Sequence, residues 1–284
     1  MANIRIVTDS TSDIPEAVRK QYGIEMVPLK VHFGSETYYD AITIQPDQFY
    51  EKLAASSSLP TTSQPSPADF LDLYKRLTDE PDTEVISIHL SAALSGTYQS
   101  ALLAKSLLDA EKPIAIIDSK SASYGIGLLA VEAAKAAQAG KSKDDILELL
   151  ARIRKEMRIY FLVGTLEYLQ KGGRIGKAAA LFGSLLNIKP ILTLDDDGEV
   201  SSVDKVRGHK KAVARIVELL KADFGDRLLN MTVAHASSPD VAAEFSEVLK
   251  ANFNIAEMTF TDVGPVIGTH AGPGTVAAFA RPVL

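Results

Sequence analysis

Short apolar segments alternate with amphipathic segments along the first half of this chain, and this alternation most constrains its fold. The short segments are rich in Ile and Val and are bounded by polar or turn-forming residues, as strands are. The longer segments between them carry apolar residues at helical spacing. Because strands that alternate with helices pair in parallel, the pattern predicts a mainly parallel sheet covered by helices. The predicted strands span residues 4–8, 25–31, 84–89 and 113–118, and the predicted helices span residues 15–22, 46–55, 67–78, 97–109, 125–139 and 143–157.

The second half of the chain has a different pattern. The segment Asp195-Asp-Asp-Gly198 is typical of a hairpin turn, which pairs its strands antiparallel. We therefore expect an α/β domain over residues 1–157 and an α+β domain over residues 158–284. No linker separates them, so the predicted ligand site is buried between the two domains. The predicted strands here span residues 158–163, 189–194, 199–206, 229–235 and 257–263, and the predicted helices span residues 177–186, 209–222 and 239–252.

Composition and charge exclude several classes of protein. The net charge is −6 and no long basic run is present, so nucleic acid is not an expected partner. The absence of cysteine excludes disulfides and thiol nucleophiles, and the five histidines lack metal-ligand spacing, so no metal site is predicted. Neither a signal peptide nor an apolar run of membrane-spanning length is present, which predicts a cytoplasmic protein with at most transient membrane contact. A lipid ligand would have to be enclosed by the fold.

Glycine and proline are concentrated around one histidine, His270. The segment 262–275 contains four glycines and two prolines. Glycine lets the backbone approach a ligand closely, and a histidine in such a loop can donate a hydrogen bond to an anionic head group. The amides from Gly272 to Thr275 are predicted to form an anion-binding nest. The alternative is a loop that only turns the chain.

Two further segments are rich in hydroxyl groups. Thr62 and Ser63 are candidates for binding a carboxylate, a phosphate or a sugar, although Ser66 in the same segment is also suited to capping the next helix. A second segment begins at Ser95. There the predicted helix start would expose amides that suit an anion, unless Ser95 serves only as a cap. The residues that complete this second segment are Gly96 and Thr97.

The loops that follow three of the predicted strands carry polar side chains. They begin at Asp9, Ser91 and Asp118. Because ligands collect at the carboxyl ends of parallel strands, we expect these loops to meet at one edge of the sheet. Ser95 with His270 as its base would make a serine hydrolase or acyltransferase. The Gly-x-Ser-x-Gly elbow of such enzymes is absent, since Ala93 stands two residues before Ser95.

Two arginines lie in basic or glycine-rich segments. Lys171-Gly-Gly-Arg-Ile-Gly-Lys177 resembles a phosphate cradle but lacks the required spacing, so a glycine helix end is favoured, with Arg174 tying the two domains together. Arg207 precedes Gly208 at a predicted strand–helix junction. There its guanidinium can meet a phosphate or a carboxylate of a partner.

Taken together, these segments resemble the DegV family of bacterial fatty-acid-binding proteins over nearly the whole chain. The resemblance implies a long-chain fatty acid buried between an α/β domain and an α+β domain. It also implies a carrier without catalytic residues of its own, the lipid-carrying subunit of a two-part fatty acid kinase. A separate ATP-binding subunit would phosphorylate the carboxylate, and the acyl phosphate would enter phospholipid synthesis. The motifs that carry the resemblance begin at Val7, Thr62, Leu94, Asp118, Lys171 and Ile188 and end with the glycine-rich segment around His270.

The resemblance also assigns residues. Thr62 and Ser95 would hold the carboxylate and His270 would complete the hydrogen-bond network, with neutral donors and without a fixed strong cation. Arg207 and Arg174 would serve the partner subunit and phosphotransfer. No cofactor besides the bound fatty acid is implied, and a lipid sensor without a kinase partner stays an alternative. The supporting loop residues would be Ser63, Gly96, Thr97 and Gly272, and the apolar segment 178–186 would contact the tail or form a plain core helix.

Overall fold

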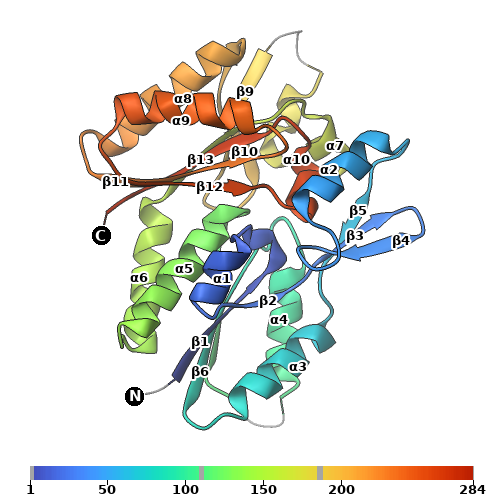
Figure 1. The fold of residues 1–284 in the computed structure, drawn as a ribbon, viewed down its shortest axis with the longest axis vertical. Coiled ribbons are helices and arrows are strands. Elements are labelled where there is room, and N and C mark those ends of the chain that lie inside the picture. Colours follow the sequence, from blue (N-terminus) through green and yellow to red (C-terminus); the bar gives the residue numbers. More distant parts are fainter. Residues whose placement is uncertain (1–2, 109–111, 184–187, 284) are drawn as a thin grey trace.

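The computed structural model describes residues 3–108, 112–183 and 188–283. Within these ranges the chain forms a four-stranded, a six-stranded and a three-stranded sheet, which helices cover and connect (Figure 1). The strands are β1 (Asn3–Asp9), β2 (Glu25–Val27), β3 (Lys30–Phe33), β4 (Glu36–Tyr39), β5 (Thr61–Ser63), β6 (Thr83–His89), β7 (Ile114–Asp118), β8 (Arg158–Leu162), β9 (Ile188–Leu194), β10 (Val200–Arg207), β11 (Leu229–His235), β12 (Ile255–Asp262) and β13 (Val276–Pro282). The helices are α1 (Glu16–Gln21), α2 (Pro46–Ala55), α3 (Pro67–Thr78), α4 (Thr97–Ser106), α5 (Tyr124–Gln138), α6 (Lys143–Glu156), α7 (Glu167–Lys171), α8 (His209–Phe224), α9 (Pro239–Asn252) and α10 (Pro265–Ala271), with short 3-10 helices η1 (Ser10–Ser12) and η2 (Gly176–Leu181).

The four-stranded sheet is parallel throughout, in the order β2-β1-β6-β7, which confirms the predicted parallel sheet. Ile6 and Ile86 belong to the apolar cluster on one face, whereas their neighbours Val7 and Val85 belong to the cluster on the other. Successive side chains of a strand point to opposite faces, so these runs of β-branched residues bury both faces of the sheet. Helices α3 and α4 pack on one face, and α5 packs on the other with α6 beside it (Figure 1).

The six-stranded sheet has the order β10-β9-β8-β13-β11-β12. Its neighbouring strands are antiparallel except for the parallel pair β11 and β12. Helices α8 and α9 cover one face, and the other face turns toward the parallel sheet (Figure 1). The predicted hairpin joins β9 to β10, and the amide of Gly198 donates to the carbonyl of Asp195 at 2.9 Å. These features confirm the predicted combination of an α/β part and an α+β part.

The two parts share one apolar cluster. Ile6 and Ile86 of the parallel sheet lie in the same cluster as Ala234, Ala277 and Phe279 of the six-stranded sheet. The two halves therefore pack closely, while the division at residue 157 stays a prediction. No helix in the described part of the chain combines the length and the apolar character that a membrane span requires.

In the first half the structure differs from the predicted pattern at the segment 25–31, at β5, and at β4, which was not predicted. The segment 25–31 is not one strand: β2 joins the parallel sheet, and β3 pairs with β4 and β5 in the three-stranded sheet. Pro28 stands between them, and proline cannot donate a hydrogen bond to a neighbouring strand. β5 was not among the predicted strands. It pairs with β3 through residues 61–63, which fixes the direction of the Thr62 side chain.

In the second half the structure differs at α10, β13 and η2, and at α7, which was not predicted. The segment around His270 is a helix, α10, which begins at Pro265 and ends before Gly272, so the predicted loop is wrong there. β13 was not predicted at all. The predicted helix over residues 177–186 is only the short η2 where the structure describes it, and residues 184–187 lie outside the described residues.

Candidate functional site

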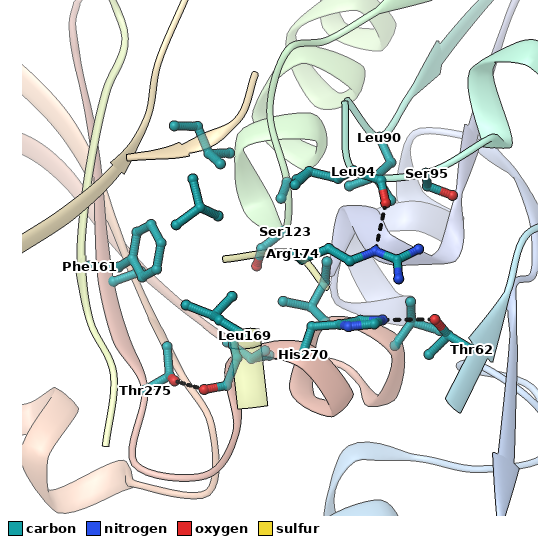
Figure 2. A pocket seen from close by; sticks show the side chains of 18 of the residues that line it. Thr62, Leu90, Leu94, Ser95, Ser123, Phe161, Leu169, Arg174, His270 and Thr275 are labelled. Carbon is teal, nitrogen blue, oxygen red and sulfur yellow. Dashed lines mark hydrogen bonds between the residues drawn. The ribbon is translucent and has the colours of Figure 1, made fainter. Parts of the chain in front are cut away.

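A largely apolar cavity lies between the six-stranded sheet and the parallel sheet (Figure 2); its empty space, together with the part that opens to solvent, is about 910 Å³. One wall is the inner face of the six-stranded sheet, which contributes Ile159, Phe161 and Phe279. The opposite wall comes from the loops that follow β6 and β7. The third wall is α10, with His270 at its carboxyl-terminal end. A cavity of this size and lining is suited to a small apolar ligand.

Polar loops meet at the carboxyl edge of the parallel sheet, as predicted. The amide of Leu90 donates to the Asp9 carboxylate at 3.1 Å, and the amide of Ala92 donates to the Asp118 carboxylate at 3.2 Å. Asp9 also accepts from the amide of Thr11. Asp9 and Asp118 thus hold the backbones of these loops in place. No group of three or more His, Cys, Asp or Glu side chains within residues 3–108, 112–183 and 188–283 converges as a metal site.

Thr62 and His270 lie together at one end of the cavity (Figure 2). The Thr62 Oγ1 atom is 2.8 Å from the His270 Nε2 atom, although the two residues are 208 positions apart in the sequence. Strand β5 presents Thr62, and the last turn of α10 presents His270. The fold therefore brings together two of the three predicted head-group residues.

The imidazole of His270 is neutral at physiological pH. Burial, followed by the positive charge of Arg174, lowers the pKa of His270 to about 4. The Nδ1 atom is buried and has no hydrogen-bond partner among the described residues. A buried N–H without an acceptor is costly, so the ring proton belongs on Nε2, where it donates to Thr62. The hydroxyl of Thr62 then accepts this bond and can donate its own proton to another acceptor.

Gly172 makes room for His270. A Cβ atom at residue 172 would lie 2.3 Å from the His270 Nδ1 atom, closer than any real contact. The glycine is the residue after α7, and its amide donates to the carbonyl of Tyr168 as a helix end does. The Lys-Gly-Gly-Arg segment is thus a helix end, as the sequence favoured, and it also accommodates the imidazole.

Ser95 lines the same cavity as Thr62 and His270. Its Oγ atom lies 2.9 Å from the hydroxyl of Thr97 and accepts from the Thr97 amide at 3.3 Å. Gly96 leaves space for a residue that the sequence did not single out: a Cβ atom at residue 96 would lie 2.6 Å from the side-chain nitrogen of Gln64. Gln64 also lines the cavity, so it adds an amide to the polar groups there.

Arg174 lies at the same polar end of the cavity as Thr62 and His270 (Figure 2). Its Nε atom donates to the carbonyl of Leu94 at 3.0 Å, and its Nη1 atom donates to the carbonyl of Gly172 at 2.7 Å. The first bond joins the two halves of the chain, as predicted. The expectation of a head-group end without a fixed cation is wrong, because the guanidinium stands close enough to His270 to lower its pKa.

Several predicted supporting residues point elsewhere. Ser63 faces away from Thr62 on β5, and its hydroxyl lies 2.9 Å from the Nε2 atom of His32. The amides of Gly272 and Gly274 donate to the carbonyls of Gly268 and Ala236, so the predicted anion nest is not available at these two residues. Ser66 caps α3 by accepting a hydrogen bond from the amide of Asp69, which agrees with the prediction that it caps the next helix.

The remaining candidates lie outside the lining of the cavity. Arg207 is exposed at the end of β10, beside Gly208. The described part of the apolar segment, residues 178–183, does not line the cavity either. Ala178 packs against Val200 and its neighbours, whereas Phe182 is 48% exposed. The expected tail contacts of this segment are therefore not seen in its described part.

The geometry does not favour a serine hydrolase. The Ser95 hydroxyl is bonded to Thr97, and the Nε2 atom of His270 is bonded to Thr62. A nucleophilic serine needs a hydrogen bond to its base, and the base needs an orienting acid. The described residues contain no carboxylate bonded to His270, whose Nδ1 atom faces Gly172.

A second, more polar depression adjoins the polar end of the cavity. Thr62, Arg174 and His270 line both spaces, and the outer one is completed by Tyr168, Lys171 and the loop that leads from α2 to β5. These three polar side chains therefore separate the apolar interior from the outer surface. A ligand whose polar end reached them would be approachable from outside.

Comparison with known proteins gives consistent results. A family model described as "Uncharacterised protein, DegV family" matches residues 3–283. A DegV domain-containing protein of Caldanaerobacter subterraneus is 38% identical over 98% of this chain and 99% of its own length. A structure from Thermus thermophilus, reported for the fatty acid binding of a DegV family protein, is similar with a TM-score of 0.92, at 37% identity over 100% of both chains. The crystal structure of DegV from Bacillus subtilis, described as a fatty acid binding protein, has a TM-score of 0.90, at 38% identity over 100% of both chains.

Proposed function

This chain belongs to the DegV family, and from that premise we propose that it binds a long-chain fatty acid in the apolar cavity. The observation that carries the proposal is the form of the cavity: an apolar interior that ends at Thr62, Ser95 and His270. These side chains would hold the carboxylate. Fatty acid binding described for the similar proteins from Thermus thermophilus and Bacillus subtilis supports this assignment.

The tail supplies most of the binding free energy. A sixteen-carbon chain buries about fourteen methylenes at roughly 0.8 kcal/mol each, so the gross gain is about 11 kcal/mol. Association and ordering offset several kcal/mol of this gain. A tight complex is still expected, because the interior consists mainly of aliphatic and aromatic side chains such as Leu90, Phe161 and Phe279.

The head group requires donors, because burying a carboxylate without hydrogen bonds is costly. The neutral His270 donates its Nε2 proton to Thr62, which leaves the Thr62 hydroxyl proton free for the carboxylate. The Ser95 hydroxyl is a second donor on the same cavity wall. The guanidinium of Arg174 adds a positive potential that favours the ionised acid. The ligand would therefore bind as its anion.

We further propose that the chain acts as a carrier, which presents the carboxylate to a separate ATP-dependent kinase subunit for formation of an acyl phosphate. The outer depression supports this proposal, because it reaches Thr62, Arg174 and His270 from the protein surface. In this proposal Arg207, exposed at the end of β10, contacts the partner subunit rather than the lipid. The acyl phosphate would serve phospholipid synthesis.

Lipid binding is tested by native mass spectrometry of the purified chain, before and after incubation with palmitate. We expect one fatty acid per chain. Thr62→Val removes the hydroxyl donor, and we expect palmitate affinity to fall about tenfold, since a hydrogen bond to a charged group is worth roughly 1.5–3 kcal/mol. Thr37→Val, at an exposed residue of β4, is the matched control and should bind as the wild type does. A chain that carries no lipid in either condition contradicts the proposal.

The carrier role is tested separately, with the kinase subunit of the same organism and ATP. Arg207→Ala should load palmitate normally and yield acyl phosphate at least about tenfold more slowly, as expected when a rim charge that serves association is lost. Lys205→Ala, two residues away on the same strand and also exposed, is the control. A wild-type chain that binds lipid but yields no acyl phosphate would instead favour the lipid sensor.

A further inference from the structure

Helix α10 carries His270, and it begins without a side-chain cap of its own. Its N-cap residue is Gly264, which has no side chain. In a capping box the residue three positions on accepts from the N-cap amide, but here that residue is Ile267, which has no side-chain acceptor. The acceptor comes instead from the other end of the chain. The amide of Gly264 donates to the Oδ1 atom of Asp13 at 3.0 Å, across 251 positions of sequence.

The same carboxyl group also holds the opposite wall of the apolar cavity. Ser123 lines that wall, and its hydroxyl donates to the Oδ2 atom of Asp13 at 2.5 Å. Both residues have a positive φ, 49° for Asp13 and 52° for Ser123, in a region that side chains seldom adopt. Such conformations persist where the surrounding structure enforces them, and they concentrate at functional sites. One side chain thus joins the loop after β7 to the start of α10.

Asp13 is buried, and its surroundings favour the neutral acid. Burial raises the pKa of Asp13 well above its usual value of 3.8, although the hydrogen bond from Ser123 opposes this shift. A neutral carboxyl group has the shape of a carboxamide. Asparagine at this position could therefore accept from Gly264 through its oxygen and donate to Ser123 through its nitrogen. Alanine could do neither.

Helix α10 is tied to the first half of the chain at both ends. At its carboxyl-terminal end, the Nε2 atom of His270 lies 2.8 Å from the hydroxyl of Thr62. Just before its start, the hydroxyl of Tyr50 donates to the carbonyl of Val263 at 2.9 Å, beside the bond that Asp13 accepts. The seven residues of α10 span about 10 Å as one hydrogen-bonded unit. A displacement at its start is therefore passed on to His270.

We propose, given the fatty acid binding proposed for this chain, that Asp13 is a positioning residue for the head group. By holding the start of α10, it sets where His270 meets Thr62 and the carboxylate of the ligand. Asp13 itself does not line the apolar cavity, so it serves the lipid without touching it. Its loss should weaken recognition of the carboxylate and spare recognition of the tail.

The test compares two ligands that share a tail, palmitate and hexadecanol, titrated into the delipidated full chain. Asp13→Ala should lower palmitate affinity about tenfold, the effect of weakening one hydrogen bond to a charged group, and leave the affinity for the alcohol unchanged. Asp13→Asn should restore palmitate affinity. The matched control is Asp145→Ala, since Asp145 accepts from the amide of Ser142 at the start of α6, a helix outside the cavity lining. It should lower stability without changing the ratio of the two affinities.

Gly264→Ala tests the same contact from the other side. A Cβ atom at residue 264 would lie 2.6 Å from the Oδ1 atom of Asp13, whereas the φ of −68° suits alanine. This variant should reproduce the loss of palmitate affinity even if Asp13→Ala does not fold. In the lipid-free chain, NMR of the histidine side-chain nitrogens should show a changed Nε2 signal of His270 in both variants, with His270→Gln providing the assignment.

Three results would overturn the inference. They are equal losses for palmitate and hexadecanol in Asp13→Ala and Gly264→Ala, no recovery in Asp13→Asn, and an unchanged His270 signal in Asp13→Ala and Gly264→Ala. The first two would mean that Asp13 only stabilises the fold. Because the NMR signal is read without lipid, it tests the role of Asp13 even if the wild-type chain binds no palmitate, a result that would contradict the proposed fatty acid binding alone.

Discussion

At the scale of single residues, the polar end of the cavity depends on the absence of a side chain at Gly172. Gly172 touches the imidazole of His270, and any larger residue would displace the ring from Thr62. We expect Gly172→Ala to lower palmitate affinity about tenfold, the value of one hydrogen bond to a charged group. Titration of the delipidated variant by calorimetry measures this loss.

The neighbouring glycine offers a matched control. Gly173 has a φ of +68°, but a Cβ atom there would meet nothing within 4 Å. Gly173→Ala should therefore cost about 1–2 kcal/mol of stability through its left-handed backbone conformation, and leave lipid affinity unchanged. If the two alanine variants lost affinity equally, the contact with His270 would not be the cause.

A second residue-scale prediction concerns Asp40, which is buried and whose Oδ2 atom accepts from Ser10 at 2.8 Å. Burial, followed by the negative charge of Asp9, raises the pKa of Asp40 from 3.8 to about 7. The unfolded chain releases this proton first, so the free energy of unfolding falls as the pH rises from about 4 to about 7. Asp40→Asn removes the ionisation, and we expect it to be more stable than the wild type by about 1–3 kcal/mol at pH 8.

Urea unfolding at pH 4, 6 and 8 tests this prediction. The two proteins should be similarly stable at pH 4, where Asp40 is protonated in the folded state, and the difference should grow toward pH 8. A parallel dependence of both proteins on pH would show that Asp40 does not titrate in this window.

The sequence predicted which residues line the cavity better than it predicted the contacts that these residues make. Thr62, Ser95 and His270 all line one cavity, and Arg174 joins the two halves as expected. Gln64 was missed as a cavity residue because its amide reaches the site only where Gly96 leaves space, a contact between distant segments. The anion nest was wrong since the amides of Gly272 and Gly274 are used within the fold, which no local pattern could reveal.

At the scale of elements, β8 sets one end of the cavity. Phe161 projects from this strand across the pocket from Thr62 (Figure 2). We expect Phe161→Ala to extend the space available to the tail, so that the ratio of affinities for eighteen-carbon and fourteen-carbon acids rises severalfold, each added methylene being worth about 0.8 kcal/mol. Competition between the two acids, followed by native mass spectrometry, measures the ratio.

Phe260→Ala on β12 is the control for this change, because Phe260 is 46% exposed and lies outside the lining of the cavity. An unchanged ratio in Phe161→Ala, with the variant folded, would place the end of the tail elsewhere.

Of the predicted helices, those that begin with a proline have the most accurate bounds. Helices α2, α3 and α9 begin and end at the predicted residues, and each starts with a proline, which is suited to the first turn. The same rule identifies α10, where Pro265 begins the helix and Gly272 ends it, yet the density of glycine suggested a loop. β13 was missed because all seven of its residues are buried, so it lacks the alternation that marks a strand exposed on one face.

At the scale of the whole molecule, the cavity belongs to both halves of the chain. Residues that follow β6 form one wall and residues of β8 and β13 form the other. A fatty acid should therefore stabilise both sheets together, by about 2.7 kcal/mol when the free ligand is at 100 times its Kd. We expect palmitate to raise the Tm by roughly 5 °C or more.

Hydrogen exchange gives this prediction its spatial test. Amides of β6 and of β13 should both exchange more slowly with palmitate, and acetate, which lacks the tail, should leave both unchanged. Protection restricted to one sheet would mean that the ligand does not bridge the two halves.

The position of β13 within its sheet has a consequence for biosynthesis. β8 and β11 do not pair with each other; β13, the last strand in the chain order, inserts between them. Domains generally begin to fold during synthesis, starting from the amino terminus. On the ribosome, the parallel sheet has all its strands once residue 118 has emerged, whereas the six-stranded sheet stays divided until translation has passed residue 282. The wall of the cavity that β13 supplies is therefore completed only after residue 282 has been translated.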